Sequence, residues 1–186
     1  CYGFPIREYD NKIPSDLTAE QILIRSGNIG SVRIAQKIGP EKYKSFLEKI
    51  GVLSQIKFDI EEVAPQKNYN FGKCKLATAS YGHGIATTIL QLTKGYAILS
   101  NGGFDVKPTL ISKNNKNHKQ RDRILNKGVS EQVVSVLRKI VNTEEGTAKF
   151  ANVPNYEIGG KTGTADKVLD GVYSEGKVNT FASIFP

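Results

Sequence analysis

The sequence predicts a mixed α and β fold (α+β) in which helices surround the beginning of an antiparallel sheet. Apolar residues recur at helical spacing in several segments of the first 141 positions. The last segment changes period, and residues 156–164 and 178–185 are predicted to be two strands joined by a polar turn that contains Asp170-Gly171. We find no internal repeat and no second domain, so one domain is expected over the 186 residues.

The N-terminal part is predicted to begin with two helices joined by a tight turn. Thr18 followed by Gln21 is a capping-box pattern, which predicts a short helix that ends near Arg25. After the turn at Ser26-Gly27-Asn28, apolar residues recur at helical spacing over residues 29–38.

Two further helices follow. Gly39-Pro40 ends the second helix and starts a third, which Gly51 closes. The polar stretch from about Ser54 to Leu76 is expected to be irregular. The next helical segment, within residues 84–103, is apolar on almost every side, which predicts burial in the core and a left-handed C-cap at Asn101-Gly102-Gly103.

The last helical pattern precedes the strands. Its apolar positions run from Val133 to Val141, and Ser130 is the predicted N-cap.

Composition limits the classes of function. The net charge of +8 allows an anionic partner, but much of it lies in the polar run from Lys107 to Gly128, which predicts a solvated loop and leaves nucleic-acid binding with charge as its sole support. Cys1 and Cys74 form no motif, so neither a zinc site nor a disulfide framework is indicated. We also expect no other metal and no cofactor. No run approaches the roughly 18 apolar residues of a membrane span, so we expect neither a membrane span nor a signal peptide within these 186 residues.

Both ends of the sequence suggest a fragment. The chain contains no methionine, and it ends at NTFASIFP, within a predicted buried strand. We therefore expect a partial domain, truncated at both ends.

A lysine-containing strand carries the first candidate site. Lys161 precedes Thr162, Gly163 and Thr164, but it does not belong to a phosphate-binding loop, because Asn155 stands where that motif needs its first glycine. The lysine supplies positive charge, the threonines supply hydroxyl donors, and the glycine lets a ligand lie against the strand edge. Such an edge would bind an extended peptide that ends in a carboxylate. An exposed lysine on a hairpin is the alternative.

The turn at Ser26-Gly27-Asn28 is the second candidate. It can direct a hydroxyl and a carboxamide into one cleft, although short S-x-N strings usually cap helices.

In this order, the two motifs resemble the transpeptidase domain of penicillin-binding proteins, whose sites combine S-x-x-K, S-x-N and K-[ST]-G. Three longer segments are similar to the family as well, and they cover nearly the whole chain: LIRSGNIGSVRIAQKIGPEKYKSFLEKIGV, ATASYGHGIATTILQLTKGYAILSNGG and EEGTAKFANVPNYEIGGKTGTADK. The similarity is greatest to the class B, division-type (septal) enzymes. It implies an incomplete penicillin-binding/β-lactamase-like fold, with the helical part and one hairpin of the central antiparallel sheet.

The resemblance implies D,D-transpeptidation of peptidoglycan stem peptides and binding of β-lactams. Ser26 would relay protons, Asn28 would hydrogen-bond the substrate amide, and Lys161 would give the pocket positive potential. Thr162 and Thr164, beside Gly163, would bind the terminal carboxylate, and the Thr164 N–H would be one oxyanion donor. Gly146-Thr147-Ala148 also matches the family and is assigned a structural role. The resemblance further implies a parent at the outer (periplasmic) face of the cytoplasmic membrane, with division proteins as partners.

The sequence departs from the family pattern at the nucleophile. No S-x-x-K precedes Ser26, and the two such strings, at 54–57 and 174–177, both follow S-x-N and are interpreted as chance matches. We therefore expect this chain to be inactive alone. The alternative is a non-catalytic peptidoglycan-binding or interaction module that kept the carboxylate-binding strand.

Overall fold

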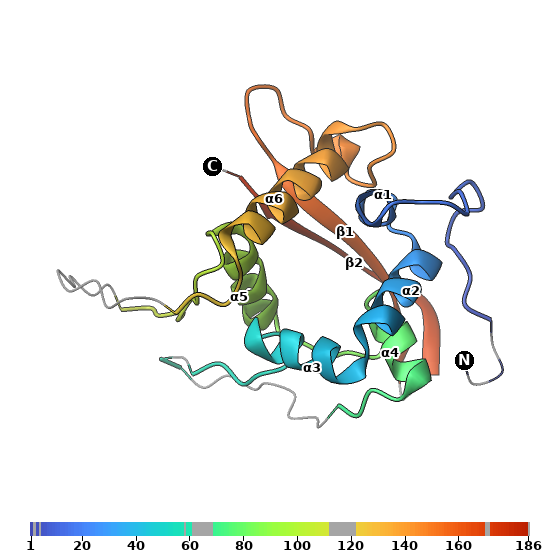
Figure 1. Cartoon of the computed structure of the whole chain (residues 1–186), viewed down its shortest axis with the longest axis horizontal. Coiled ribbons are helices and arrows are strands. Elements are labelled where there is room, and N and C mark those ends of the chain that lie inside the picture. The colour runs from blue at the N-terminus through green and yellow to red at the C-terminus, as the bar shows by residue number, and fades with distance from the viewer. Residues whose placement is uncertain are drawn as a thin grey trace. The chain divides into compact units, whose positions relative to one another are not determined.

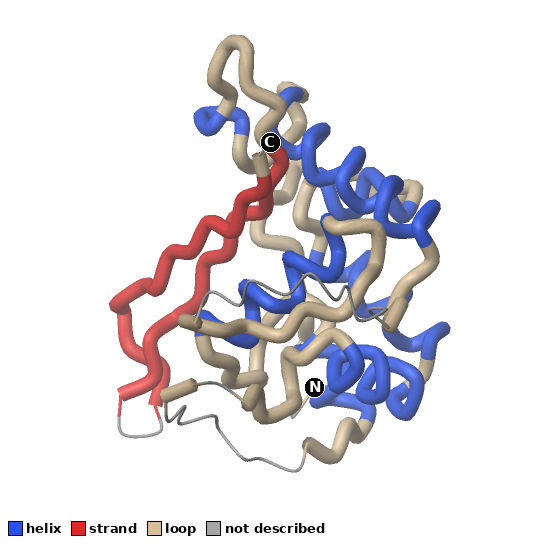
Figure 2. The backbone as a smooth tube through the Cα atoms, turned by 90° about the vertical axis from the view of Figure 1, so that its left-hand side faces the viewer, coloured by secondary structure: helices blue, strands red, loops and turns tan. Residues whose placement is uncertain are grey.

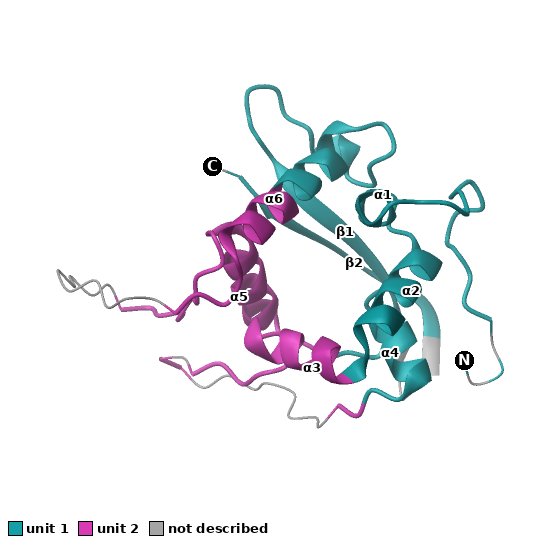
Figure 3. Ribbon diagram, in the orientation of Figure 1, with its two compact units in different colours: residues 1–40, 71–85, 135–186 teal, residues 41–70, 86–134 magenta. Residues whose placement is uncertain are grey.

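The structure of the chain is a computed structural model, and it describes residues 1, 3, 5–57, 59–60, 69–111, 122–169 and 172–185. Helices come first along the chain and a β-hairpin comes last (Figure 1). The contacts divide the chain into two compact units (Figure 3). Unit 1 contains residues 1–40, 71–85 and 135–186, and unit 2 contains residues 41–70 and 86–134.

Three short helices form much of unit 1: α1 (Ala19–Ile24), α2 (Asn28–Ile38) and α4 (Lys73–Ala79). The predicted capping box is confirmed, because the Thr18 side chain accepts from the Gln21 N–H while the Gln21 side chain accepts from the Thr18 N–H. Helix α2 packs against both α1 and α4. The helices α1 and α2 thus lie on either side of the Ser26 turn, as the sequence predicts.

Helix α4 corrects the prediction of an irregular stretch from Ser54 to Leu76. The helix begins at Lys73 and buries Leu76, Ala77 and Ala79. Seven residues with two alanines at buried positions give too short and too weak an apolar pattern to be recognised by periodicity. Residues 58 and 61–68 of the same stretch lie outside the described residues.

The hairpin of unit 1 consists of β1 (Gly159–Leu169) and β2 (Val172–Ile184), which pair in antiparallel fashion along their length (Figure 2). The register pairs Lys161 with Ala182 and Thr164 with Asn179, and an irregularity follows Asp166. The predicted hairpin is confirmed, with strands that reach further toward the turn than expected. The predicted turn residues 170–171 lie outside the described residues.

Unit 2 is built on α3 (Pro40–Lys49), which begins at the last residue of unit 1, on α5 (Ile89–Ser100) and on the first half of α6 (Lys127–Asn142). Helix α5 buries Gln91, Gly95 and Ile98, whereas Ile89 is 86% exposed. The prediction of burial on almost every side is therefore wrong for this chain. The buried Gln91 is satisfied, because its amide nitrogen donates to the Ser54 carbonyl at 2.7 Å.

The start of α6 corrects a second prediction. The helix begins at Lys127 and continues past Ser130, so Ser130 is not its N-cap. Its hydroxyl instead donates to the Leu99 carbonyl at 2.6 Å and accepts from the Gly102 N–H at 3.0 Å, which satisfies backbone groups at the end of α5. Gly102 has a φ of 83°, so the predicted left-handed cap of α5 is confirmed there.

Within the ranges that the structure describes, no helix is both long and apolar enough to span a bilayer. The same residues contain no cluster of three or more His, Cys, Asp or Glu that could hold a metal ion.

Candidate active site

Ser26 lies in the turn between α1 and α2 and has a left-handed backbone conformation, with a φ of 57°. The Ser26 N–H donates to the Leu23 carbonyl and the Gly27 N–H donates to the Ile22 carbonyl, at 3.3 and 2.9 Å. These two bonds are those of a Schellman motif, in which glycine normally occupies the left-handed position. A serine there costs roughly 1 kcal/mol. Backbone strain of this kind is concentrated at functional positions, which makes the Ser26 hydroxyl a candidate functional group.

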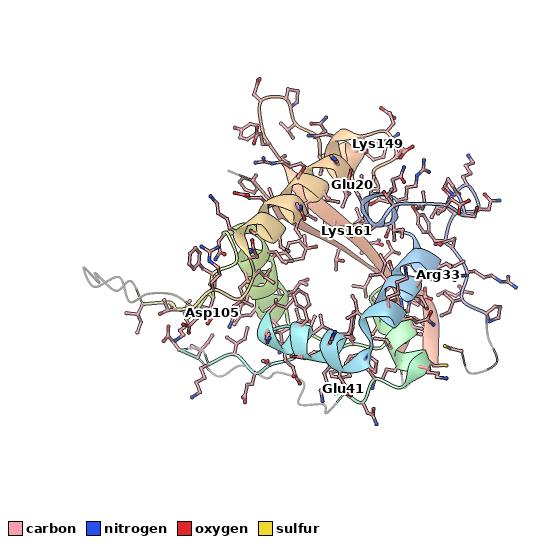
Figure 4. The ribbon with its side chains drawn as sticks, viewed as in Figure 1. Glu20, Arg33, Glu41, Asp105, Lys149 and Lys161 are labelled. Atoms are coloured by element: carbon pink, nitrogen blue, oxygen red, sulfur yellow. The ribbon has the colours of Figure 1, made fainter. Side chains whose placement is uncertain are left out.

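Lys161 is the hydrogen-bond partner of the Ser26 hydroxyl. Its Nζ donates to the Ser26 hydroxyl at 2.7 Å and to the Thr162 carbonyl at 2.9 Å. The predicted proximity of Ser26 and Lys161, 135 positions apart in sequence, is therefore confirmed. Figure 4 labels Lys161 on β1. Burial lowers the pKa of the lysine from 10.5 to about 8, because the charged form loses hydration and no carboxylate among the described residues pairs with it.

Asn28 is the first residue of α2, and the helix N-terminus is capped from a distance. Gly27, the N-cap, has no side chain to offer, and the two oxygens of Glu8 accept instead from the N–H groups of Asn28 and Ile29, at 2.5 and 2.9 Å. The Asn28 side chain donates to the Arg7 carbonyl at 2.9 Å. The carboxamide is thus held by the N-terminal segment, at a position two residues from the strained serine.

Thr162 is oriented by a neighbouring turn. Its hydroxyl donates to the Thr147 hydroxyl at 2.9 Å. The Gly146-Thr147-Ala148 turn packs tightly behind it, because a Cβ on Gly146 would lie 2.0 Å from the Ile140 carbonyl oxygen. This geometry agrees with the structural role predicted for the turn and adds a specific partner, Thr162.

Gly163 and Thr164 complete the strand motif. A Cβ on Gly163 would lie 2.6 Å from the Thr180 hydroxyl on β2, so a larger residue there would require the exposed Thr180 side chain to rotate. The Thr164 side chain is exposed. Its assignment as a carboxylate-binding residue and oxyanion donor stays a prediction.

Two ion pairs connect α1 and its C-cap to α6 and the segment that follows it, and no pattern in the sequence indicates either pair. Arg25 pairs with Glu145 at 2.5 Å, and Glu20 pairs with Lys139 at 2.6 Å. Both pairs join α1 to residues more than 100 positions away, and Arg25 directly precedes Ser26. They connect the α1 side of the Ser26 turn to the segment that contains the end of α6.

Neither S-x-x-K string forms a serine–lysine pair among the described contacts. The Ser54 hydroxyl donates to the Glu48 carbonyl, and the Ser174 hydroxyl donates to the Lys167 carbonyl. Lys177 of the second string pairs with Asp166 across the hairpin. This geometry is consistent with the interpretation of both strings as chance matches.

Comparison with known proteins identifies the family. The chain matches the family model of the penicillin binding protein transpeptidase domain over residues 2–186. The chain belongs to this family. A peptidoglycan D,D-transpeptidase FtsI homolog of Mesostigma viride is 30% identical to this transpeptidase-domain chain over 92% of its length, and a probable peptidoglycan D,D-transpeptidase FtsI of Caulobacter vibrioides is 28% identical over 91%.

Solved structures of the family share the fold. Penicillin-binding protein 3 of Mycobacterium tuberculosis, complexed with ampicillin, matches 97% of the chain with a TM-score of 0.85 and 25% identity, and the chain covers 44% of that structure. The transpeptidase domain of Burkholderia pseudomallei penicillin-binding protein 3 matches 90% of the chain with a TM-score of 0.78 and 27% identity, and 51% of that domain is covered. The predicted α+β transpeptidase fold, present in part, is thus confirmed. The chain spans about a third of the length of the curated relatives, 33% and 30% of the two proteins above.

Proposed function

We propose that this chain is part of a serine-type peptidoglycan D,D-transpeptidase that cross-links stem peptides during cell-wall synthesis and is acylated by β-lactams. The observation that carries the proposal is the hydrogen bond of 2.7 Å from the Lys161 ammonium to the strained Ser26 hydroxyl. Membership of the transpeptidase family supports it. The ampicillin complex of the Mycobacterium tuberculosis relative supports the β-lactam part.

Lys161 and Ser26 would form a proton relay beside the reacting centre. With a pKa of about 8, roughly one lysine in ten is neutral at pH 7, so the amine can accept a proton as well as donate one. The Ser26 hydroxyl can pass that proton on, because a hydroxyl both donates and accepts. In this role Ser26 transfers a proton to the leaving amine of the substrate and does not attack the carbonyl.

The strand beside the relay would hold the substrate. Thr164 would donate its hydroxyl hydrogen bond to the terminal carboxylate of the peptide, which corresponds to the acid group of penicillin. Thr162 would do the same once its hydroxyl proton turns from Thr147 toward the substrate and the Thr147 hydroxyl donates to Thr162 in return. The positive charge of Lys161 favours the same anion. Asn28 would contact the substrate amide.

The attacking serine is expected elsewhere in a longer protein. No S-x-x-K precedes Ser26 here, and we propose that this chain alone transfers no acyl group. The same observation favours the second candidate, a binding module that keeps the carboxylate-binding strand without the chemistry.

Labelling of the complete protein with a fluorescent penicillin separates the two candidates. A transpeptidase forms an adduct that survives denaturation and gel electrophoresis, and excess unlabelled benzylpenicillin prevents its formation. Labelled penicillin that binds reversibly and is released on denaturation would support the binding module and contradict the enzyme.

The cellular setting follows as a proposal from the same family. We expect the complete protein at the outer face of the cytoplasmic membrane, where stem peptides are cross-linked, and in association with division proteins. Immunoprecipitation of the tagged complete protein from membrane fractions would test both expectations.

A further inference from the structure

A groove in unit 1 adjoins the Ser26 turn at Gly27 and contains neither residue of the proposed relay. It encloses about 940 Å³ between the N-terminal segment, α1 and α2. Its walls are mainly aliphatic: Ile13, Leu17, Ile22, Ile29 and Ile34. Of these, Ile29 is 39% exposed. The volume lies at the upper end of the range for ligand sites, which is large enough for several side chains of a bound segment.

The basic residues of the groove wall lack acidic partners within the described part of the chain, whereas its acidic residue is hydrogen-bonded. Arg33 and Lys37 lie one turn apart on α2, and neither has an acidic partner among the residues that the structure describes. Figure 4 labels Arg33 on α2. The one carboxylate in the wall, Glu8, is already occupied by the two N–H groups at the start of α2. The groove therefore presents two free positive charges beside an apolar floor.

Two like charges at i and i+4 repel each other and destabilise a helix slightly. An anionic ligand that bridged them would remove this repulsion. Their Cα atoms are separated by roughly 6 Å along the helix axis, which matches the spacing of two carboxylates at i and i+4 of another helix. A concave apolar floor with such a rim suits a protruding amphipathic segment, as in helix-in-groove recognition, and does not suit the flat surface of a bilayer.

We propose that this groove, lined by Ile22, Ile29, Arg33, Ile34 and Lys37, is a docking site for an acidic amphipathic segment of a partner protein. The segment places leucine-like side chains on the isoleucine floor and two carboxylates, one helical turn apart, on Arg33 and Lys37. The docking site contains none of the residues assigned to the relay or to carboxylate binding.

The test uses the 186-residue chain and a fluorescein-labelled 14-residue model peptide with leucines on one helical face and glutamates at i and i+4 beside it. Fluorescence anisotropy should show saturable binding, at least about tenfold weaker for the Arg33→Glu/Lys37→Glu variant. A peptide with lysines in place of the glutamates should show the reverse preference. The Lys42→Glu/Lys107→Glu variant is the matched control, because it changes the net charge equally at two exposed positions outside unit 1.

Amide chemical shifts locate the binding. The acidic peptide should shift the resonances of Gly27, Ile29 and Gly30, which line the groove. If Arg33→Glu/Lys37→Glu does not fold by circular dichroism, the milder Arg33→Gln/Lys37→Gln variant replaces it. Three results would overturn the proposal: no saturable binding up to millimolar peptide, equal weakening by both charge-reversal variants, or binding to phosphatidylglycerol vesicles in place of the peptide.

Discussion

Replacement of Lys161 by methionine should change how the stability of the chain depends on pH. Methionine keeps the length of the aliphatic stem but removes the ammonium, which burial disfavours. In the native chain the pKa is lowered on folding from 10.5 to about 8, so the unfolded chain binds more protons between these values. The free energy of unfolding of the native chain therefore rises with pH through this window, by about 2 kcal/mol between pH 7 and pH 9.5.

Urea unfolding followed by circular dichroism at pH 7, 8, 9 and 9.5 measures this effect. Burial raises the pKa of Tyr43 and Tyr96, which lowers stability at still higher pH. The native chain and Lys161→Met share these tyrosines, so their contribution cancels in the difference between the two free energies of unfolding. Lys167→Met, at an exposed position of the same strand, is the control and should follow the native chain. Parallel pH profiles for the native chain and Lys161→Met would refute the assignment of a buried, desolvated lysine.

Three further predictions concern packing and chemistry. Gly146→Ala should destabilise the chain by about 3 kcal/mol or more in urea unfolding, because its Cβ would overlap the Ile140 carbonyl. Gly128→Ala, in the first turn of α6, where a Cβ would meet the Asn126 side chain at an ordinary contact distance, should stabilise the chain by about 0.5 kcal/mol. Equal effects of the two substitutions would show that the Gly146 turn is not tightly packed. Ser26→Gly should change the free energy of unfolding by no more than about 1 kcal/mol, because relief of backbone strain offsets the loss of one hydrogen bond. The same substitution should slow β-lactam acylation of the complete protein. A normal acylation rate would remove this serine from the relay. The chain alone, incubated with benzylpenicillin, should gain no mass in mass spectrometry, and a stoichiometric adduct on the serine of either S-x-x-K string would show that the nucleophile is present after all.

The parts of the fold that depend on local signals could be predicted from the sequence. The capping box of α1, the helices on either side of Ser26 and the terminal hairpin follow from spacing that a few residues specify. Helix α4 and the start of α6 could not be predicted in the same way. The first is too short to show periodicity, and in the second Ser130 bonds to the end of α5, which lies about 30 positions away in sequence.

In the candidate site, too, the residues could be predicted from local motifs, whereas the contacts that position them could not. The motifs at Ser26-Gly27-Asn28 and Lys161 to Thr164 identified the residues, and the order of the motifs suggested that they meet. The contacts that place them are non-local. The cap supplied by Glu8 and the pair between Arg25 and Glu145 join segments with no shared pattern, so a single sequence carries no signal for either.

The central claim, that Lys161 acts at the reacting centre, is tested most directly by the rate of benzylpenicillin acylation of the complete protein carrying Lys161→Ala. The comparison is with Lys167→Ala, which removes an exposed lysine from the same strand. Loss of a preorganised charge and proton relay should reduce the second-order acylation rate constant by about 100-fold or more, with a melting temperature close to that of the unmodified protein, while Lys167→Ala acylates normally. Equal acylation rates for the two variants would contradict the account.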